Sequence, residues 1–225
     1  MFYTIGSLTE TAYRANAAEE ATFKWLLQTL TECCGYSCSF LLELDVSEIE
    51  LWWAPDLNSK GILGAWSIMH PKCIYMGVNR VSVPKRLIEQ CEARHIDAET
   101  VLHFSGLLET NIMIAMIHEL IHMFQFRTCP PLFVINYLVT RLIDKIPYVN
   151  RIGVEYDARK NSEDPELVDF AKKLSAAYDF YVNLQLHGKE DSIVDGTHKF
   201  INTHGVMMGN YAIEMFNNLN SSKLS

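Results

Sequence analysis

The fold is decided by one stretch near the middle of the chain, Met116-Ile-His-Glu-Leu-Ile-His-Met-Phe-Gln125. Apolar residues stand on nearly every side of this stretch and continue back to Gly106, which predicts a helix over 106–126. A helix without a polar face is expected between two layers of a protein core. Ser105 is its predicted N-cap, and the prolines that begin at Pro130 end it.

Two histidines and a glutamate occupy the middle of this helix in the order H-E-x-x-H. His118 and His122 are four residues apart, so both imidazoles leave the same face of the helix, one turn apart. Imidazole nitrogens in this arrangement bind Zn²⁺, and burying them without a partner would be costly. Glu119 is rotated by about 100° around the axis and can reach a zinc-bound water without being a ligand. The motif therefore predicts a Zn²⁺ site with Glu119 as the general base.

A third zinc ligand must come from another part of the chain, because catalytic sites use three protein ligands and keep one position open. We take His204 as this ligand, since His204-Gly205 opens the last predicted helix. Glu155 is the alternative: it follows His122 by 33 residues, a spacing similar to that of gluzincin peptidases, and forms an E-x-x-A pattern with Ala158. His187, also followed by glycine, is a further option.

The remaining sequence predicts a small sheet before the metal helix and several helices after it. We expect helices at 9–34, 84–94, 132–146, 152–160, 165–186 and 206–219, strands at 39–44, 48–53, 62–69 and 73–79, a turn at 55–61, and linkers at 161–164 and 187–197. We therefore predict an α+β, zincin-like single domain over residues 1–225. In it, a small mixed sheet packs on the buried helix, and residues 130–200 form a helical insertion.

Composition and charge exclude several classes of protein. Hydrophobic residues make up 49% of the 225 residues and charged residues 20%, which excludes a mostly disordered chain. The 27 acidic residues outnumber the 19 basic ones, giving a net charge of −8 that does not support nucleic-acid binding, although local basic contacts are still allowed. We expect no signal peptide and no membrane partner. The six cysteines are then predicted to be reduced thiols in the cytoplasm or another reducing intracellular compartment.

The segment from residue 73 to residue 217 resembles the SprT-like zinc metallopeptidases, which include the Spartan-type proteases. The resemblance rests on a short strand, on the metal helix, and on a His-Gly element followed by apolar residues; these are residues 74–79, 116–125 and 204–217. It implies a zincin-like fold, His204 as the third ligand, and a protein or peptide substrate.

These observations predict a zinc-dependent metallopeptidase in which Glu119 is the general base and later the proton shuttle. The alternative is a non-catalytic structural or assembly protein in which zinc staples the helical half to the core. An open coordination position favours the enzyme, whereas four protein ligands, including both Glu155 and His204, favour the structural role.

Two further predictions concern the substrate. The strand at 73–79 is a candidate edge strand along which a substrate pairs by β-augmentation. Tyr148, Tyr156 and Tyr211 are candidates for stabilising the oxyanion.

The cluster Cys33-Cys34-x₃-Cys38 is interpreted as plain thiols, because no second pair of Cys or His follows at zinc-ribbon spacing.

Overall fold

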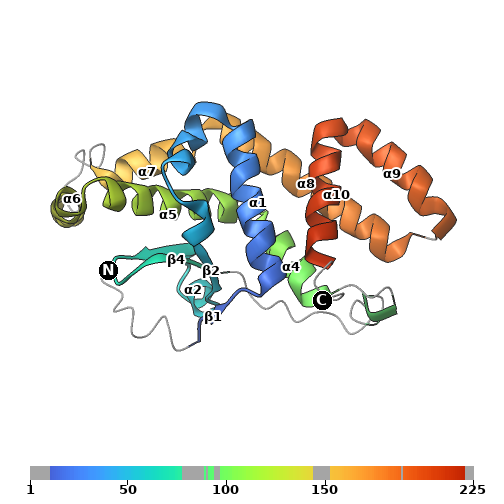
Figure 1. The fold of residues 1–225 in the computed structure, drawn as a ribbon, viewed down its shortest axis with the longest axis horizontal. Helices are drawn as coiled ribbons and strands as arrows, with labels where there is room; N and C mark the ends of the chain where they lie inside the picture. Colours follow the sequence, from blue (N-terminus) through green and yellow to red (C-terminus); the bar gives the residue numbers. More distant parts are fainter. Residues whose placement is uncertain are drawn as a thin grey trace.

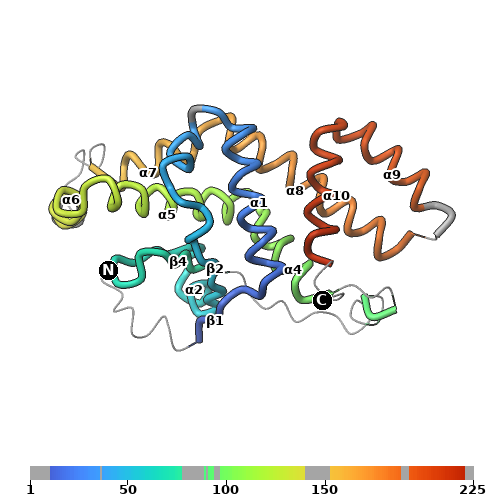
Figure 2. The backbone as a smooth tube through the Cα atoms, in the orientation of Figure 1, coloured from blue at the N-terminus to red at the C-terminus, as the bar shows by residue number. Residues whose placement is uncertain are grey.

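The computed structural model describes residues 11–77, 89, 91–93, 97–143, 153–188 and 190–220. Figure 1 shows a small sheet beneath a long central helix, with further helices extending to either side. The tube in Figure 2 follows the same path and shows that the chain runs from the sheet, through the central helix, into an all-helical C-terminal half. The predicted helix over 84–94 lies largely outside the described residues.

The sheet has four strands, β1 (Tyr13–Arg14), β2 (Glu50–Trp53), β3 (Gly64–Ser67) and β4 (His70–Met76), in the order β1-β2-β4-β3. β2 pairs with β4 in parallel, and the other two pairs are antiparallel. The prediction of an α+β fold with a small mixed sheet is therefore confirmed. The prediction that 73–79 is an edge strand is wrong, because the tight β3–β4 hairpin adds β3 outside β4. Within the described sheet, β3 is the edge strand on that side.

A buried polar network joins the first helix to the sheet. α1 (Ala17–Cys33) begins with a capping box between Asn16 and Glu19. Glu19 Oε2 also accepts a hydrogen bond from Trp53 Nε1 at 3.1 Å, and Glu19 Oε1 lies 2.8 Å from His103 Nδ1. One carboxylate thereby links α1, β2 and the helix that carries His103, and each polar atom buried here has a partner, as burial requires.

The segment after α1 forms 3₁₀ helices where a strand was predicted at 39–44. The helices are η2 (Gly35–Leu42) and η3 (Val46–Glu48). Cys38, Leu41 and Leu44 are buried. These buried residues are three positions apart, which matches a 3₁₀ helix, whereas a half-buried strand would bury every second residue. A short helix, α2 (Asp56–Ser59), fills the predicted turn at 55–61.

The helix predicted over 106–126 corresponds to α5 (Thr110–Thr128). A separate helix that was not predicted, α4 (Ala98–Leu107), precedes it, and the two helices meet at a bend of 76°. The N-cap position of α5 is Glu109, whose side chain makes no capping hydrogen bond, so the prediction of Ser105 as the N-cap of this helix is wrong. Asp97 caps α4 through a side-chain bond to the Thr100 N–H. Ser105 lies within the last turns of α4. The long apolar run continues across the bend because α4 and α5 are both buried.

The C-terminal half consists of α6 (Pro130–Ile143), α7 (Val154–Ser162), α8 (Pro165–His187), α9 (Glu190–His204) and α10 (Val206–Asn220). Four of these five match predicted helices within a few residues. The predicted linker at 187–197 is wrong, since α9 begins there. In Figure 1, α6 and α7 lie at one end of the molecule and α9 at the other.

One continuous core connects the sheet to the C-terminal helices. It includes buried residues from Ala15 to Leu219, with Met116, Ile117 and Leu120 of α5 at 0% exposure. α8 contributes to the same core. Within the described ranges, no helix is by itself long and apolar enough to cross a membrane; the bent pair α4–α5 meets that criterion only when its two helices are taken together.

Candidate metal centre

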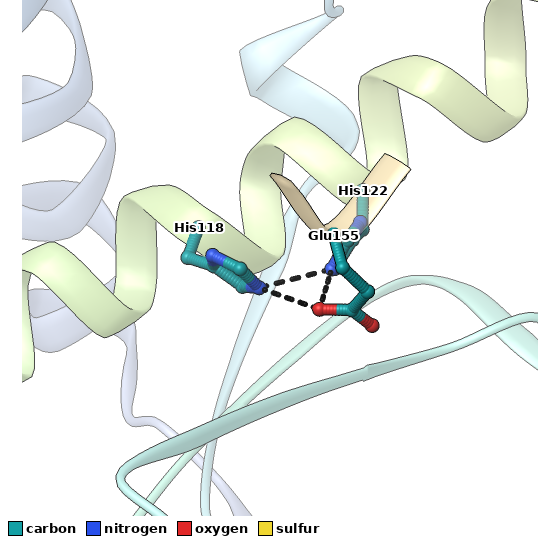
Figure 3. Close-up of side chains that lie close together, drawn as sticks. All are labelled: His118, His122 and Glu155. Atoms are coloured by element: carbon teal, nitrogen blue, oxygen red, sulfur yellow. Dashed lines mark hydrogen bonds and ion pairs between the residues drawn. The ribbon is translucent and has the colours of Figure 1, made fainter. Parts of the chain in front are cut away.

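The H-E-x-x-H histidines meet a carboxylate from a different helix. His118 and His122 project from α5, and their Nε2 atoms lie 3.0 Å apart. Glu155, in the first turn of α7, places Oε2 at 3.4 Å from His118 Nε2 and at 3.5 Å from His122 Nε2. Figure 3 shows the two imidazoles and the carboxylate converging on one point between the helices.

The start of α7 sets the position of Glu155. Gly153 precedes the helix with φ of +99°, a backbone conformation that favours glycine, and the chain turns there into α7. Ala158, one turn after Glu155, is fully buried. A small side chain at this position lets α7 lie close against its neighbours. The carboxylate therefore faces the two histidines from the first turn of a well-packed helix.

The donor set fits a zinc ion. Two imidazole nitrogens and one carboxylate oxygen lie within 4.8 Å of one another, and these are the ligand types that zinc binds in catalytic sites. In the part of the chain that the structure describes, no other group of His, Cys, Asp or Glu side chains comes together in this way. The site is therefore a candidate for three-ligand metal binding through His118, His122 and Glu155.

The charges at the cluster favour a deprotonated glutamate beside protonated histidine when no metal is bound. Burial alone would raise the pKa of Glu155, but the hydrogen bonds from His118 and His122 outweigh burial and lower it far below its usual range. Burial alone would lower the pKa of His122, but its contact with Glu155 outweighs burial and raises it. A metal cation would take over the place of the protons, because it also offsets the carboxylate charge.

Glu119 lies beside this cluster but faces the sheet. Its Oε2 accepts a hydrogen bond of 2.9 Å from the backbone N–H of Trp66 on β3. Burial raises the pKa of Glu119, although the nearby His122 and His118 oppose the rise. The Trp66 N–H bonds to Oε2 alone, so the other carboxylate oxygen of Glu119 does not take part in this hydrogen bond. Glu119 can therefore hold a proton next to the metal-ligand face of α5, as a general base requires.

Gln125 connects the two helices that carry the ligands. Its Oε1 lies 3.0 Å from His122 Nδ1, and its Nε2 donates to Val154 O at 3.2 Å and to Asp157 Oδ2 at 2.9 Å. Gln125 and Asp157 are not among the site residues predicted from the sequence. A signal was present, because Gln125 follows His122 by three residues and therefore lies on the same face of the helix.

His204, the preferred third ligand in the sequence analysis, lies elsewhere. It is the last residue of α9, and its imidazole packs against Phe180 and Phe200 with ring centroids 5.5 and 5.0 Å away. α9 and α7 lie at opposite ends of the view in Figure 1. The structure thus brings the alternative candidate, Glu155, to the two histidines and keeps His204 in an aromatic contact.

The other candidate residues are not among the three side chains that come together as possible metal ligands. His187 ends α8 and is exposed. Tyr211 contacts Cys33 Sγ at 3.2 Å through its hydroxyl, whereas Tyr156 follows Glu155 and is 38% exposed. Tyr148 lies outside the described residues. The cysteines at 33, 34 and 38 are free thiols.

Aromatic residues pack against one side of the cluster. The ring of Phe133, a buried residue of α6, lies 5.9 Å from that of His122 and 5.6 Å from that of Trp66. Phe126 completes the group at 5.9 Å from Phe133. The edge strand β3, α5 and α6 are thereby held together next to the candidate metal ligands.

No protein-family model, curated protein or solved structure matches the chain.

Proposed function

We propose that the protein is a zinc-dependent metallopeptidase whose ligands are His118, His122 and Glu155. The observation that carries the proposal is the convergence of these three side chains from two helices, with Glu119 beside them on the same helix. The two-histidine and one-glutamate set is the one used by zinc peptidases of the thermolysin type. His204 has no part in the proposed site.

Each residue then has a defined task. A bound zinc ion supplies a polarised water of lowered pKa and a Lewis acid for the substrate carbonyl. Glu119 accepts a proton on the carboxylate oxygen that is not bonded to the Trp66 N–H, and later returns it to the leaving amine. The Trp66 N–H keeps the glutamate side chain turned towards β3, which limits its motion during proton transfer.

The edge position of β3 supports a polypeptide substrate. Among the described strands, β3 pairs with β4 on one side only, and the Trp66 N–H of its backbone lies within hydrogen-bond distance of the general base. An extended peptide that added a strand at this edge would pass next to the metal ligands. A strand before a metal helix makes up two of the three parts of the resemblance to SprT-like peptidases, and we retain these two in the proposal; the third part, the His-Gly element with His204, is left out.

The test begins with metal binding. Purified protein should bind about one Zn²⁺ per chain, and His118→Ala and Glu155→Ala should each weaken binding strongly. His204→Ala is the matched control and should bind zinc like the wild type, since it removes an imidazole outside the site. Equal losses for Glu155→Ala and His204→Ala would reject the proposed ligand set.

The second part of the test is hydrolysis. Zinc-loaded wild type should cleave an unfolded, fluorescently labelled protein, and a chelator should stop the cleavage. Re-addition of zinc should restore it. A protein that holds zinc tightly and cleaves none of a broad panel of unfolded substrates would instead support a second function, a structural zinc staple. That alternative is favoured by one observation: the three ligands bridge two helices, α5 and α7, and His122 and Glu155 are 33 residues apart in sequence.

A further inference from the structure

Gln125 is the residue of α5 that contacts both a metal-ligand candidate and the helix that supplies the third one. Its amide reaches His122 on its own helix, and the backbone and side chain of α7 at Val154 and Asp157. These two α7 positions lie on either side of Glu155. Gln125 therefore holds the first turn of α7 one residue before and two residues after the proposed ligand.

The partners of Gln125 determine which way its amide points. Val154 O is a carbonyl oxygen and Asp157 Oδ2 is a carboxylate oxygen, and both accept hydrogen bonds. The NH₂ group of Gln125 must therefore face α7. The amide oxygen must then face His122. Since this oxygen only accepts, His122 Nδ1 must carry a proton and donate it across the 3.0 Å contact.

This arrangement selects one tautomer of the ligand histidine. With the proton on Nδ1, the Nε2 of neutral His122 keeps its lone pair, and it is Nε2 that faces His118 and Glu155. Asp157 is itself held in place, because its Oδ1 accepts a hydrogen bond from Asn161 Nδ2 at 3.1 Å. The chain of contacts runs from Asn161 through Asp157 and Gln125 to His122.

We infer that Gln125 is a positioning residue for the proposed zinc site, which sets the tautomer of His122 and joins it, with Asp157, to the helix that carries Glu155. The inference rests on the proposed function for its metal. Partners of this kind typically change metal affinity about 10–100-fold when they are lost.

The first test measures the zinc dissociation constant of Gln125→Met, which keeps the length of the side chain but removes its hydrogen bonds. We expect zinc binding to weaken by about 10–100-fold. In the metal-free protein, at a pH high enough for the His122 imidazole to be neutral, we expect the ¹⁵N spectrum to show that the fixed Nδ1-protonated tautomer is lost. Gln28→Met, at an exposed glutamine of α1, is the matched control and should change neither. The melting temperature of the metal-free protein should shift little in both variants.

The second test reverses the polarity of the contact to α7. Gln125→Glu places a carboxylate opposite the carboxylate of Asp157. Adding Asp157→Asn to that variant supplies an NH₂ donor at position 157, and the amide oxygen of the new asparagine still accepts from Asn161. Asp157→Asn should therefore strengthen zinc binding in the Gln125→Glu background and weaken it in the wild type. This reversal of sign is not expected for a residue that only supports the fold, and it does not depend on how Gln125→Met folds.

The outcomes separate this inference from the proposed function. Unchanged zinc affinity in Gln125→Met, or an effect of Asp157→Asn with the same sign in both backgrounds, would overturn the positioning role and leave the zinc site intact. A wild-type protein that takes up no zinc would overturn the proposed function, and the role of Gln125 with it.

Discussion

Replacing Glu119 with glutamine should separate catalysis from folding at the candidate site. Glutamine is nearly isosteric and retains a carbonyl oxygen, so it can still accept the 2.9 Å hydrogen bond from the Trp66 N–H. Because burial raises the pKa of the carboxyl group, a neutral amide also avoids the cost of burying a charge. We therefore expect Glu119→Gln to melt close to the wild type and to bind zinc normally.

The catalytic effect of the same change should be large. An amide cannot accept the proton that a general base removes, and loss of such a base typically costs a factor of about 10²–10⁴ in rate. That range corresponds to about 2.7–5.4 kcal/mol in the activation free energy. Glu119→Ala is the comparison for stability, since it also leaves the Trp66 N–H without its acceptor, a loss worth about 1–3 kcal/mol.

The assay compares kcat/KM for an unfolded protein substrate with zinc content and thermal melting in the same preparations. Glu119→Gln should lose rate alone, whereas Glu119→Ala should lose rate and stability. A Glu119→Gln protein that cleaves within about threefold of the wild-type rate, far inside the expected loss, would refute the assignment of Glu119 as general base. A lower melting temperature for Glu119→Gln than for Glu119→Ala would refute the account of the Trp66 contact.

Three further outcomes follow from the site and its surroundings. The pKa of Glu155 is lowered and that of His122 is raised in the folded, metal-free protein. This pair should therefore add most to the free energy of unfolding between about pH 4.3 and 6.5. Urea unfolding should show stability falling as pH drops through the pKa of Glu155 and as it rises through that of His122; a flat profile would contradict this. Free zinc at about 100 times its dissociation constant should stabilise the wild type by about 2.7 kcal/mol and His118→Ala by almost nothing, as thermal melts can check. Phe133→Ala should lower the free energy of unfolding by about 3–5 kcal/mol because the ring is 4% exposed. Leu132→Ala is the control: its side chain is 55% exposed, and the change should be less than about 0.5 kcal/mol. Equal losses in the two variants would show that Phe133 does not anchor α6.

The fold was predictable from the sequence where one local pattern determined one element. The residues of α5 could be assigned to a buried helix because apolar residues surround the motif on all sides. The segment at 39–44 could not, since a short apolar run fits a strand as well as a 3₁₀ helix until the burial of Cys38, Leu41 and Leu44 is known. The start of α5 was predicted too early for a different reason: the polar residues Glu109, Thr110 and Asn111 mark the break after α4, but they were included in the predicted helix over 106–126.

The site was predictable only for the part that lies on one helix. His118, Glu119 and His122 have a geometry fixed by the helical repeat, so their spacing alone places them together. The choice between Glu155 and His204 depends on how distant helices dock, which neither residue's neighbours reveal. His204-Gly205 is also the pattern that ends a helix: Gly205 has φ of +82° between α9 and α10.

The separation of Glu155 from His122 makes a bound metal a cross-link of the chain as well as a centre for chemistry. By the chain-entropy relation used for disulfides, closing a loop of about 33 residues removes about 3.7 kcal/mol of freedom from the unfolded ensemble. This gain changes slowly with loop length, since doubling the loop alters the closure term by only about 0.6 kcal/mol. The connection between α5 and α7 could therefore be lengthened considerably, by insertion after α6, and the stability that the cross-link provides would rise only slightly.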